Sequence, residues 1–277
     1  MIGVLYHPKI PASRPLAEEM ASWLQDHGQT VWLGTNWGSN IPDEQLPQSR
    51  LLIVLGGDGS MLRAARLATP YQIPLLGVNM GRIGFLCEVQ TDNWQDPLAR
   101  VLADDIWLER RLMLMMVWQR QGVVMGTSRA LNDIVVSRGM QARVVTLHLH
   151  VDDDFVTTYR ADGLIVATPT GSTAYAMAGG GPILPPQLQN FLVVPVAPYL
   201  SFDRALVLPQ ASRLMIQVEM DHEATVTVDG QAGKGLESGD KILIQRYEYD
   251  TLLARVNPPN YFYRTLLARL GVEEGSI

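Results

Sequence analysis

Hydrophobic residues in the first hundred positions form short continuous runs that alternate with helical patterns. The continuous runs are Ile2–Tyr6, Leu51–Leu55 and Leu75–Val78. Runs of this kind are typical of strands buried on both faces of a parallel sheet. Between them, Leu16–Gln25 and Ser60–Ala68 carry apolar residues at helical spacing, and the proline-containing segment His7–Pro15 predicts a loop. Strands alternating with helices predict a doubly wound α/β domain over residues 1–104.

The pattern changes near residue 105, where every second residue tends to be apolar. Arg143–Val151 is the clearest example, because its apolar residues all fall on one face of a strand. Further strand patterns are Leu164–Ala167, Leu192–Val196, Leu214–Glu219, Ala224–Val228 and Ile242–Arg246. They predict an all-β domain, a β-sandwich, over residues 105–254. A final helical pattern at Asn260–Leu270 predicts that the C-terminal segment, 255–277, returns to pack on the α/β domain.

The composition is that of a folded protein with a negative net charge. The chain is 47% hydrophobic and 18% charged, and 22 basic against 28 acidic residues give a formal charge of −6. Only three of the basic residues are lysines. A nucleic-acid partner needs a basic face, so we expect none here. Anionic ligands would instead be held locally, by arginines and backbone amides.

Cysteine content and hydropathy bear on the compartment. The single cysteine, Cys87, excludes an intrachain disulfide, which fits a reducing environment. No signal peptide is apparent, and no apolar run approaches the ~20 residues of a membrane span. We therefore expect a soluble cytoplasmic protein without a membrane partner.

A glycine-rich loop joins the second apolar run to the helical pattern after it. The loop reads Gly56-Gly57-Asp58-Gly59-Ser60. Glycines let the backbone approach a phosphate, and the first amides of a helix are free donors. The carboxylate of Asp58 suits such a loop if it holds a cation that bridges phosphates, or takes a proton from an attacking hydroxyl. Arg63 lies one turn into the helix and could reach a phosphate. The alternative is a tight turn in which Asp58 only caps the helix.

This loop differs from two well-known phosphate-binding motifs. It lacks the Gly-Lys-Ser/Thr of a Walker A motif and the third glycine of a dinucleotide fingerprint. It resembles the phosphate loop of phosphofructokinases and, in its GGDGT form, that of diacylglycerol and sphingosine kinases.

A second glycine-rich segment is more specific. It reads Asp162-Gly163-Leu164-Ile165-Val166-Ala167-Thr168-Pro169-Thr170-Gly171-Ser172-Thr173-Ala174-Tyr175. An apolar strand ends here in a turn that offers hydroxyls, amides and one flat aromatic ring, which suits the polar edges and stacking face of a nucleoside. Together with the first loop, the segment closely resembles the NAD kinase family, whose members phosphorylate the 2′-hydroxyl of the adenosine ribose of NAD.

Three further stretches resemble motifs of the same family, in the same order. They are Asn79-Met80-Gly81-Arg82-Ile83-Gly84-Phe85-Leu86, Leu131-Asn132-Asp133-Ile134-Val135-Val136 and Val228-Asp229-Gly230-Gln231. Five ordered motifs between residues 56 and 231 make a chance resemblance very improbable.

The resemblance implies a role for each matching residue. Asp58 would be the proton acceptor or the metal-organising carboxylate, and Gly59 would contact NAD or the phosphoryl donor. Asn132 and Asp133 would hydrogen-bond the adenosine of NAD. The other implied dinucleotide contacts are Arg63, Arg143, Arg160, Asp162, Thr170, Gly171, Ser172, Thr173, Ala174, Tyr175 and Gln231. Among them, Thr170, Ala174 and Tyr175 would line the adenine pocket, and Arg143 and Arg160 would meet a phosphate.

Two positions depart from the family pattern. Ala176 and Ala178 follow the Thr-Ala-Tyr segment where serine is common, which puts one substrate hydrogen bond in doubt. Asp133 is one methylene shorter than the glutamate common at its position.

The resemblance also implies the reaction and the architecture. The expected fold is a Rossmann-like α/β domain and a β-sandwich domain, with the reaction in the cleft between them. ATP, another nucleoside triphosphate or polyphosphate would be the donor, with Mg²⁺ as the expected divalent cation. No metal ligand is assigned beyond Asp58 acting through Mg-ATP. The family implies a homodimer or homotetramer.

Two other functions remain open from the sequence. The glycine loop alone fits a phosphofructokinase-like sugar kinase, although the Thr-Ile-Asp-Asn-Asp run of that family is absent. A sensor that binds NAD(H) without turnover is the non-enzymatic alternative.

Overall fold

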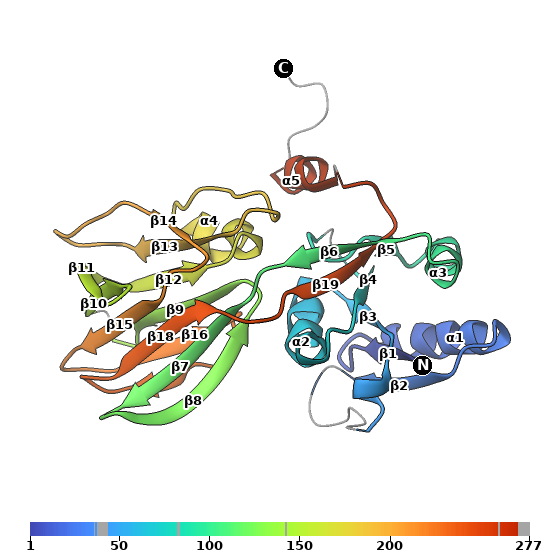
Figure 1. The fold of residues 1–277 in the computed structure, drawn as a ribbon, viewed down its shortest axis with the longest axis horizontal. Coiled ribbons are helices and arrows are strands. Elements are labelled where there is room, and N and C mark those ends of the chain that lie inside the picture. Colours follow the sequence, from blue (N-terminus) through green and yellow to red (C-terminus); the bar gives the residue numbers. More distant parts are fainter. Residues whose placement is uncertain (36, 38–43, 82–83, 142, 260, 271–277) are drawn as a thin grey trace, which may run out of the picture. The chain divides into compact units, whose positions relative to one another are not determined.

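The computed structural model describes the chain except for residues 36, 38–43, 82–83, 142, 260 and 271–277. It divides into two compact units (Figure 1). The first unit is Met1–Arg110 with Thr251–Ile277, and the second is Arg111–Asp250. None of the described helices has the length and hydropathy needed to span a membrane.

The first unit is an α/β layer. Its helices are α1 (Ser13–Asp26), α2 (Asp58–Ala68), α3 (Gln95–Leu102) and α5 (Tyr261–Leu270), with short 3₁₀ turns at Leu46–Gln48 and Thr69–Tyr71. Its strands are β1 (Ile2–Tyr6), β2 (Val31–Thr35), β3 (Leu51–Gly56), β4 (Leu75–Asn79), β5 (Val89–Gln90), β6 (Trp107–Arg111) and β19 (Thr251–Arg255).

The strands of this unit form one sheet, in the order β2-β1-β3-β4-β19-β6, with β5 also paired to β4. Neighbours from β2 to β19 run parallel. Every residue of β3 is buried, which explains its unbroken apolar sequence. The predicted strands and helices are therefore confirmed. The loop predicted for His7–Pro15 is shorter than expected, because α1 already begins at Ser13 and a proline is tolerated in the first turn of a helix.

The borders between the units differ from the positions 104/105 and 254/255 expected from the pattern. Both β6 and β19 belong to the first sheet, and Leu253 of β19 pairs with Leu75 of β4. The units therefore divide after residues 110 and 250. The change of pattern near residue 105 marks the end of the alternation of helices and strands. The first sheet nevertheless includes β6, before the chain enters the second unit, and β19, after the chain leaves it.

The second unit contains the remaining strands. They are β7 (Leu114–Arg120), β8 (Val123–Ala130), β9 (Asp133–Arg138), β10 (Val145–Val151), β11 (Asp154–Ala161), β12 (Gly163–Ala167), β13 (Asn190–Val196), β14 (Leu206–Pro209), β15 (Leu214–Glu219), β16 (Ala224–Val228), β17 (Lys234–Leu236) and β18 (Lys241–Arg246). A 3₁₀ turn at Thr170–Thr173 and the short helix α4 (Tyr175–Ala178) follow β12.

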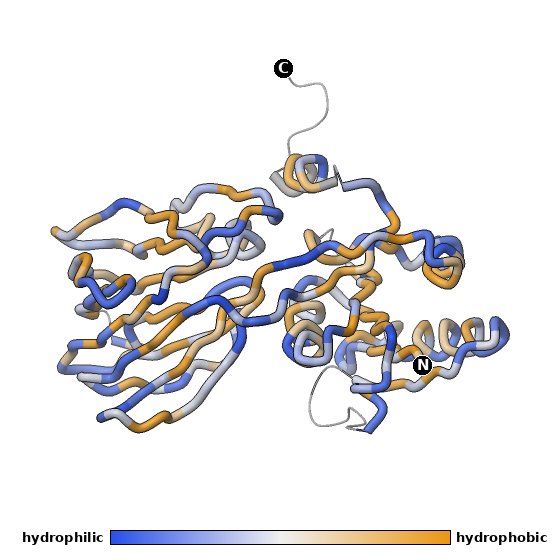
Figure 2. Tube along the Cα trace, in the orientation of Figure 1, coloured by the Kyte–Doolittle hydropathy of each residue, from blue (hydrophilic) through white to orange (hydrophobic). Residues whose placement is uncertain are grey.

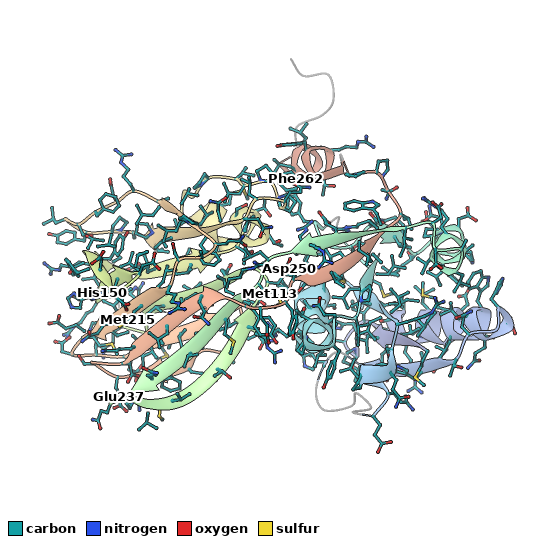
Figure 3. All side chains as sticks on the ribbon, viewed as in Figure 1. Met113, His150, Met215, Glu237, Asp250 and Phe262 are labelled. Carbon is teal, nitrogen blue, oxygen red and sulfur yellow. The ribbon has the colours of Figure 1, made fainter. Side chains whose placement is uncertain are left out.

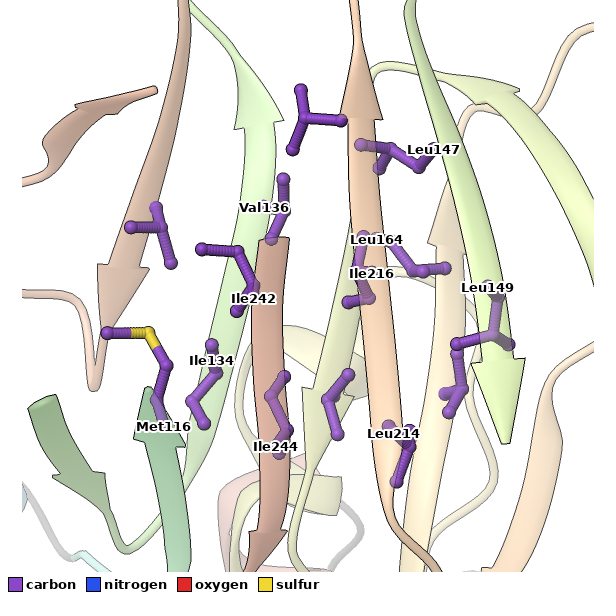
Figure 4. Close-up of a cluster of buried hydrophobic side chains, with 14 of the residues drawn as sticks. Met116, Ile134, Val136, Leu147, Leu149, Leu164, Leu214, Ile216, Ile242 and Ile244 are labelled. Carbon is purple, nitrogen blue, oxygen red and sulfur yellow. The ribbon is translucent and has the colours of Figure 1, made fainter. Parts of the chain in front are cut away.

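These strands form two antiparallel sheets of six, which confirms the predicted sandwich. The orders are β11-β10-β15-β18-β7-β8 and β14-β13-β12-β9-β16-β17. Apolar residues from both sheets meet in one core, including Ile216 and Ile242 from the first and Val136 and Leu164 from the second (Figure 4). Hydrophobic and hydrophilic stretches alternate along these strands in Figure 2, as expected for strands with one buried face.

A smaller apolar cluster lies on the outer face of β9, β12 and β13. It joins Val135, Ile165 and Val194 of the strands to Ala176 and Leu184 of the segment after β12. This packing fixes the second glycine-rich segment on the sheet.

Helix α5 covers residues 261–270 of the predicted helix, and residue 260 lies outside the described part. Phe262 of this helix is labelled in Figure 3. It is buried, and its ring centroid lies 6.0 Å from that of Phe85 in the same unit. The return of the whole segment 255–277 stays a prediction.

Candidate active site

The glycine loop lies at the carboxyl end of β3, and Asp58 is the first residue of α2. The side chain of Asp58 accepts two backbone hydrogen bonds from a distant part of the chain. Phe85 N donates to Oδ2 and Leu86 N donates to Oδ1, each at 3.1 Å. These two hydrogen bonds, one to each oxygen, fix the orientation of the carboxylate.

The segment 79–86 follows β4, the strand beside β3. Gly56 pairs with Asn79, and Met80 N donates to Gly56 O at 3.0 Å. A Cβ on Gly84 would lie 2.1 Å from Asp58 Oδ1, so only glycine lets the backbone pass this close to the carboxylate. The first two motifs therefore form one site, although residues 82 and 83 lie outside the described part.

A buried arginine supports this arrangement and was missed from the sequence. Arg255 Nη1 donates to Leu86 O at 2.9 Å, and Nη2 donates to Phe85 O at 3.3 Å. Its Nε donates to Glu109 Oε2 at 2.8 Å, and both side chains are almost completely buried. Arg255 therefore binds the carbonyl groups of Phe85 and Leu86, the same two residues whose amides bind Asp58. The one sign of this role in the sequence is that Arg255 stands at the end of a short apolar run, the one that forms β19.

In the second unit, a carboxylate organises the turn before β9. Asp229 Oδ1 accepts from Asn132 N at 2.8 Å and from Asp133 N at 3.2 Å, and Oδ2 accepts from Leu131 N at 3.2 Å. In return, Asp229 N donates to Asp133 O at 2.9 Å. The late Asp-Gly turn and the Asn-Asp motif are therefore one structure. The sequence marked Gln231 in this turn and missed the part played by Asp229.

Asp133 is 5% exposed, and Asp229 is close by. Burial and, to a lesser degree, the charge of Asp229 raise the pKa of Asp133 from 3.8 to about 7. Near neutral pH this carboxyl group therefore exchanges between a charged acceptor and a neutral form that can also donate.

The segment after β12 is tied to the same turn. Thr168 N donates to Asn132 O at 2.9 Å, and its hydroxyl donates to Leu131 O at 2.5 Å. A Cβ on Gly171 would lie 2.1 Å from Asn132 O, which requires glycine there. Three of the five motifs thus meet at one end of β12, β9 and β16, which are neighbouring strands of the second sheet of this unit.

Within this segment most hydroxyls are used internally. The Ser172 hydroxyl bonds Pro169 O and Leu184 N and O, and the Thr173 hydroxyl donates to Thr170 O. Thr170 Oγ1 accepts from the buried Arg111, another residue that the sequence did not single out. Tyr175 is 47% exposed, and Ala174 beside it is partly exposed. The aromatic ring is thus the main side chain this turn offers a ligand.

Three predicted residues lie away from this turn. Asp133 pairs with Ala167, whereas Asp162 precedes the other end of β12, about 16 Å along the strand at ~3.3 Å per residue. Asp162 forms an ion pair with Arg138 at 2.9 Å. Arg143 and Arg160 make no described contact with the Asn132–Asp133 turn.

The remaining predicted residues belong to the loop region of the first unit. Ser60 is buried, Gly57 is partly exposed and Gly59 is exposed at the start of α2. Arg63 lies further along α2, with its guanidinium over the ring of Trp37. Cys87 is buried, and burial together with the charge of Asp58 raises the pKa of its thiol to about 12.

Two other features of the described residues carry no predicted site residue. The described part of the chain contains no cluster of three or more metal-ligating side chains. A hollow of about 320 Å³ on the second unit is lined by residues such as Met215 and His150, which Figure 3 labels, and by none of the predicted site residues.

Comparisons with known proteins cover nearly the whole chain. Residues 34–106 match the family model of the ATP-NAD kinase N-terminal domain, and residues 131–256 match that of the ATP-NAD kinase C-terminal domain. The NAD kinase of Chloroflexus aurantiacus is 37% identical over 97% of this chain and 98% of its own length. That of Heliobacterium modesticaldum is 38% identical over 94% of this chain and 95% of its own length.

Two solved structures have a similar fold. Yeast NADH kinase complexed with NADH matches with a TM-score of 0.87 and 24% identity, covering 100% of this chain and 88% of its own. The NAD kinase from Archaeoglobus fulgidus in complex with ATP matches with a TM-score of 0.77 and 26% identity, covering 99% of this chain and 100% of its own. On the two domain matches and the full-length relatives, this chain belongs to the NAD kinase family.

Proposed function

We propose that this chain transfers a phosphoryl group from ATP to the 2′-hydroxyl of the adenosine ribose of NAD, which produces NADP. The observation that carries the proposal is the carboxylate of Asp58, oriented by two backbone amides at the N-terminus of α2 in a chain related to NAD kinases along its whole length. ATP and NADH are the ligands in the two similar structures, which supports a nucleotide donor and a dinucleotide acceptor.

Asp58 would accept the proton of the attacking hydroxyl. The hydrogen bonds from the amides of Phe85 and Leu86 hold the carboxylate in place, as a group that takes a proton from a bound hydroxyl requires. Phosphoryl transfer demands little covalent work from the protein, so positioning and charge compensation supply most of the rate. The positive end of the α2 helix dipole, which lies at the glycine loop, would stabilise negative charge on the transferred phosphate.

A divalent cation fits the same residues. Mg²⁺ typically binds through one or two carboxylates together with substrate phosphates, and Asp58 offers one carboxylate beside an amide-rich loop. When bound, the cation would neutralise phosphate charge.

The second unit would recognise the adenosine of NAD. Asn132 and Asp133 would hydrogen-bond its polar groups, and the exposed ring of Tyr175 would stack on the base. We extend the family roles to Arg143, Arg160, Asp162 and Gln231 as part of the same proposal. We also propose a cytoplasmic location and a homodimeric or homotetrameric state.

The test is product analysis with purified protein. ATP and polyphosphate are supplied separately with Mg²⁺, each against NAD and NADH, and NADP(H) is measured by a coupled dehydrogenase. The proposal expects NADP with ATP and NAD. Absence of NADP(H) in every combination would contradict it, and phosphorylation of fructose 6-phosphate in a parallel reaction would favour the sugar-kinase alternative.

A further inference from the structure

Three residues of the first unit gather around the indole ring of a fourth, Trp37. His7 and Lys9 follow β1, Trp37 follows β2 by two residues, and Arg63 lies on α2, which follows β3. Because β1, β2 and β3 are parallel, these residues lie at the carboxyl edge of the sheet, where the glycine loop also lies. In open α/β sheets, ligands bind outside this edge.

The ring of Trp37 is the centre of the group. The Arg63 guanidinium carbon lies 3.3 Å from the ring centroid, and Lys9 Nζ lies 4.6 Å from it. The His7 ring centroid is 5.2 Å away, at an interplanar angle of 58°. Two cations on one aromatic ring are each attracted by its face, which lowers the cost of bringing them together.

The positive charge of this group is not balanced locally. In the described part of the chain, neither Lys9 nor Arg63 forms an ion pair with a carboxylate. Burial first, and then the charges of Arg63 and Lys9, lower the pKa of His7. The pKa of Arg63 is lowered by burial and by Arg66. Like charges held together without an anion indicate a place where an anionic ligand supplies the missing charge.

The donors are arranged for phosphate oxygens. A guanidinium stacked on an aromatic ring keeps its N–H groups in its own plane, free to form paired bonds with an oxyanion. Lys9 N donates to His7 Nδ1 at 3.2 Å, which leaves Nε2–H as the donor of the neutral imidazole. Arg63 follows Gly59 by four residues, so both lie on one face of α2.

We propose that His7, Lys9 and Arg63, assembled on Trp37, bind the polyphosphate chain of the phosphoryl donor. This inference rests on the proposed function. A triphosphate carries more negative charge than the diphosphate of NAD, so a group with two permanent cations and one neutral donor suits the donor substrate better. Trp37 acts as the platform that holds the cations in place.

The experiment compares Michaelis constants for the two substrates. Arg63→Gln is expected to raise the KM for ATP by about tenfold, the effect of losing a charge-assisted hydrogen bond. Lys9→Gln and Trp37→Leu are expected to raise it by smaller factors. The KM for NAD should change by less than about twofold in each variant. Arg50→Gln is the matched control, because Arg50 directly precedes β3 and therefore lies at the opposite edge of the sheet.

Binding of tripolyphosphate alone gives a readout that does not need turnover. Calorimetry at low salt should show binding to the wild type and to Arg50→Gln, and weaker binding by roughly tenfold or more in the Lys9→Gln/Arg63→Gln double variant. Thermal unfolding confirms that each variant is folded.

The outcomes separate the two proposals. NADP formation with an unchanged KM for ATP in the cluster variants, or with an equal rise in the KM for NAD, overturns this inference and leaves the proposed function standing. Absence of NADP formation by the wild type removes the proposed function, and the donor assignment with it, even if tripolyphosphate binding depends on the cluster.

Discussion

Asp58 in the glycine loop and Asp133 at the start of β9 both lie among backbone amides, but the amides serve them differently. Asp58 accepts the amides of Phe85 and Leu86 on its own carboxylate. At the second position the amides of residues 131–133 go to a neighbour, Asp229, and Asp133 is left buried beside that second carboxylate. The carboxylate of Asp58 is thus held by backbone amides, whereas the backbone amide of Asp133 is held by the carboxylate of Asp229.

This difference separates the two tasks. Hydrogen bonds on both oxygens give Asp58 a defined orientation, as a residue that accepts a proton from a bound hydroxyl needs. Burial raises the pKa of Asp133 to about 7. Near neutral pH only part of the molecules therefore carry a charge on Asp133, and a bound ligand can change that fraction. We infer that the first site is built for the chemical step and the second for recognition.

The largest effect is expected at the first site. Asp58→Asn keeps the size of the side chain but removes the proton acceptor, so kcat should fall about 10³-fold. Binding of NAD, measured by calorimetry without donor, should remain detectable. Asp92→Asn is a suitable control, because Asp92 is an exposed aspartate of the same unit. Turnover within a few-fold of wild type in Asp58→Asn would remove the proposed role.

A smaller loss is expected when the orientation of Asp58 is disturbed without changing the acid. In Gly84→Ala the new Cβ would meet Asp58 Oδ1 at 2.1 Å, so the carboxylate must move, and kcat should fall about 10²-fold. Gly81→Ala is the matched control from the same motif, since among the described residues no atom beyond the chain neighbours lies within 4 Å of a Cβ there. Equal activities of the two variants would show that the orientation of Asp58 is unimportant.

Sequence patterns predicted the acids and missed what holds them. Asp58 and Asp133 stand in motifs with local signatures, and the strands that carry them have clear periodicity. Arg255 supports Phe85 and Leu86 through contacts about 170 residues away in sequence, and no local pattern encodes such a partner. For the same reason β6 and β19 were not expected in the first sheet, because pairing with β4 is a long-range choice.

The hydroxyls of the second glycine-rich segment show the same limit. The sequence suggested them as ligand groups, but the Ser172 hydroxyl is completely buried and bonded to the backbone. Whether a hydroxyl faces the ligand or the turn depends on packing against the sheet, which composition does not reveal. Glycine and hydroxyl content therefore predicted the turn, while its exposed ring, Tyr175, is what the structure offers a base.

At the second site we expect a moderate loss of stability when Asp229 is altered. Asp229→Asn keeps the shape, but its amide group cannot accept all three backbone hydrogen bonds, which should cost about 1–3 kcal/mol of unfolding free energy. Urea denaturation measures this loss, with the exposed Asp154→Asn as the control in the same unit. Removing the charge beside Asp133 should also lower the pKa of Asp133. An unchanged stability would show that the three bonds do not hold the turn.

The smallest effect concerns the protonation of Asp133. Because its pKa is raised to about 7, the side chain is mostly neutral at pH 6 and mostly charged at pH 8. A charged carboxylate accepts a stronger hydrogen bond from a ribose hydroxyl, so the dissociation constant of NAD should fall by roughly fivefold as the pH rises through 7. Calorimetric titration with NAD in the absence of donor measures this without the pH dependence of the chemical step.

Asp133→Asn provides the control for that measurement, since an amide does not titrate and its affinity profile should be flat. The same raised pKa predicts a stability effect of opposite sign. Between about pH 4 and pH 7 the unfolded chain ionises Asp133 while the folded protein keeps it protonated, so its contribution to stability is lost as the pH rises. Asp133→Asn should therefore lose less stability than wild type across this window. Parallel pH profiles of the two proteins, in binding and in stability, would contradict the raised pKa of Asp133.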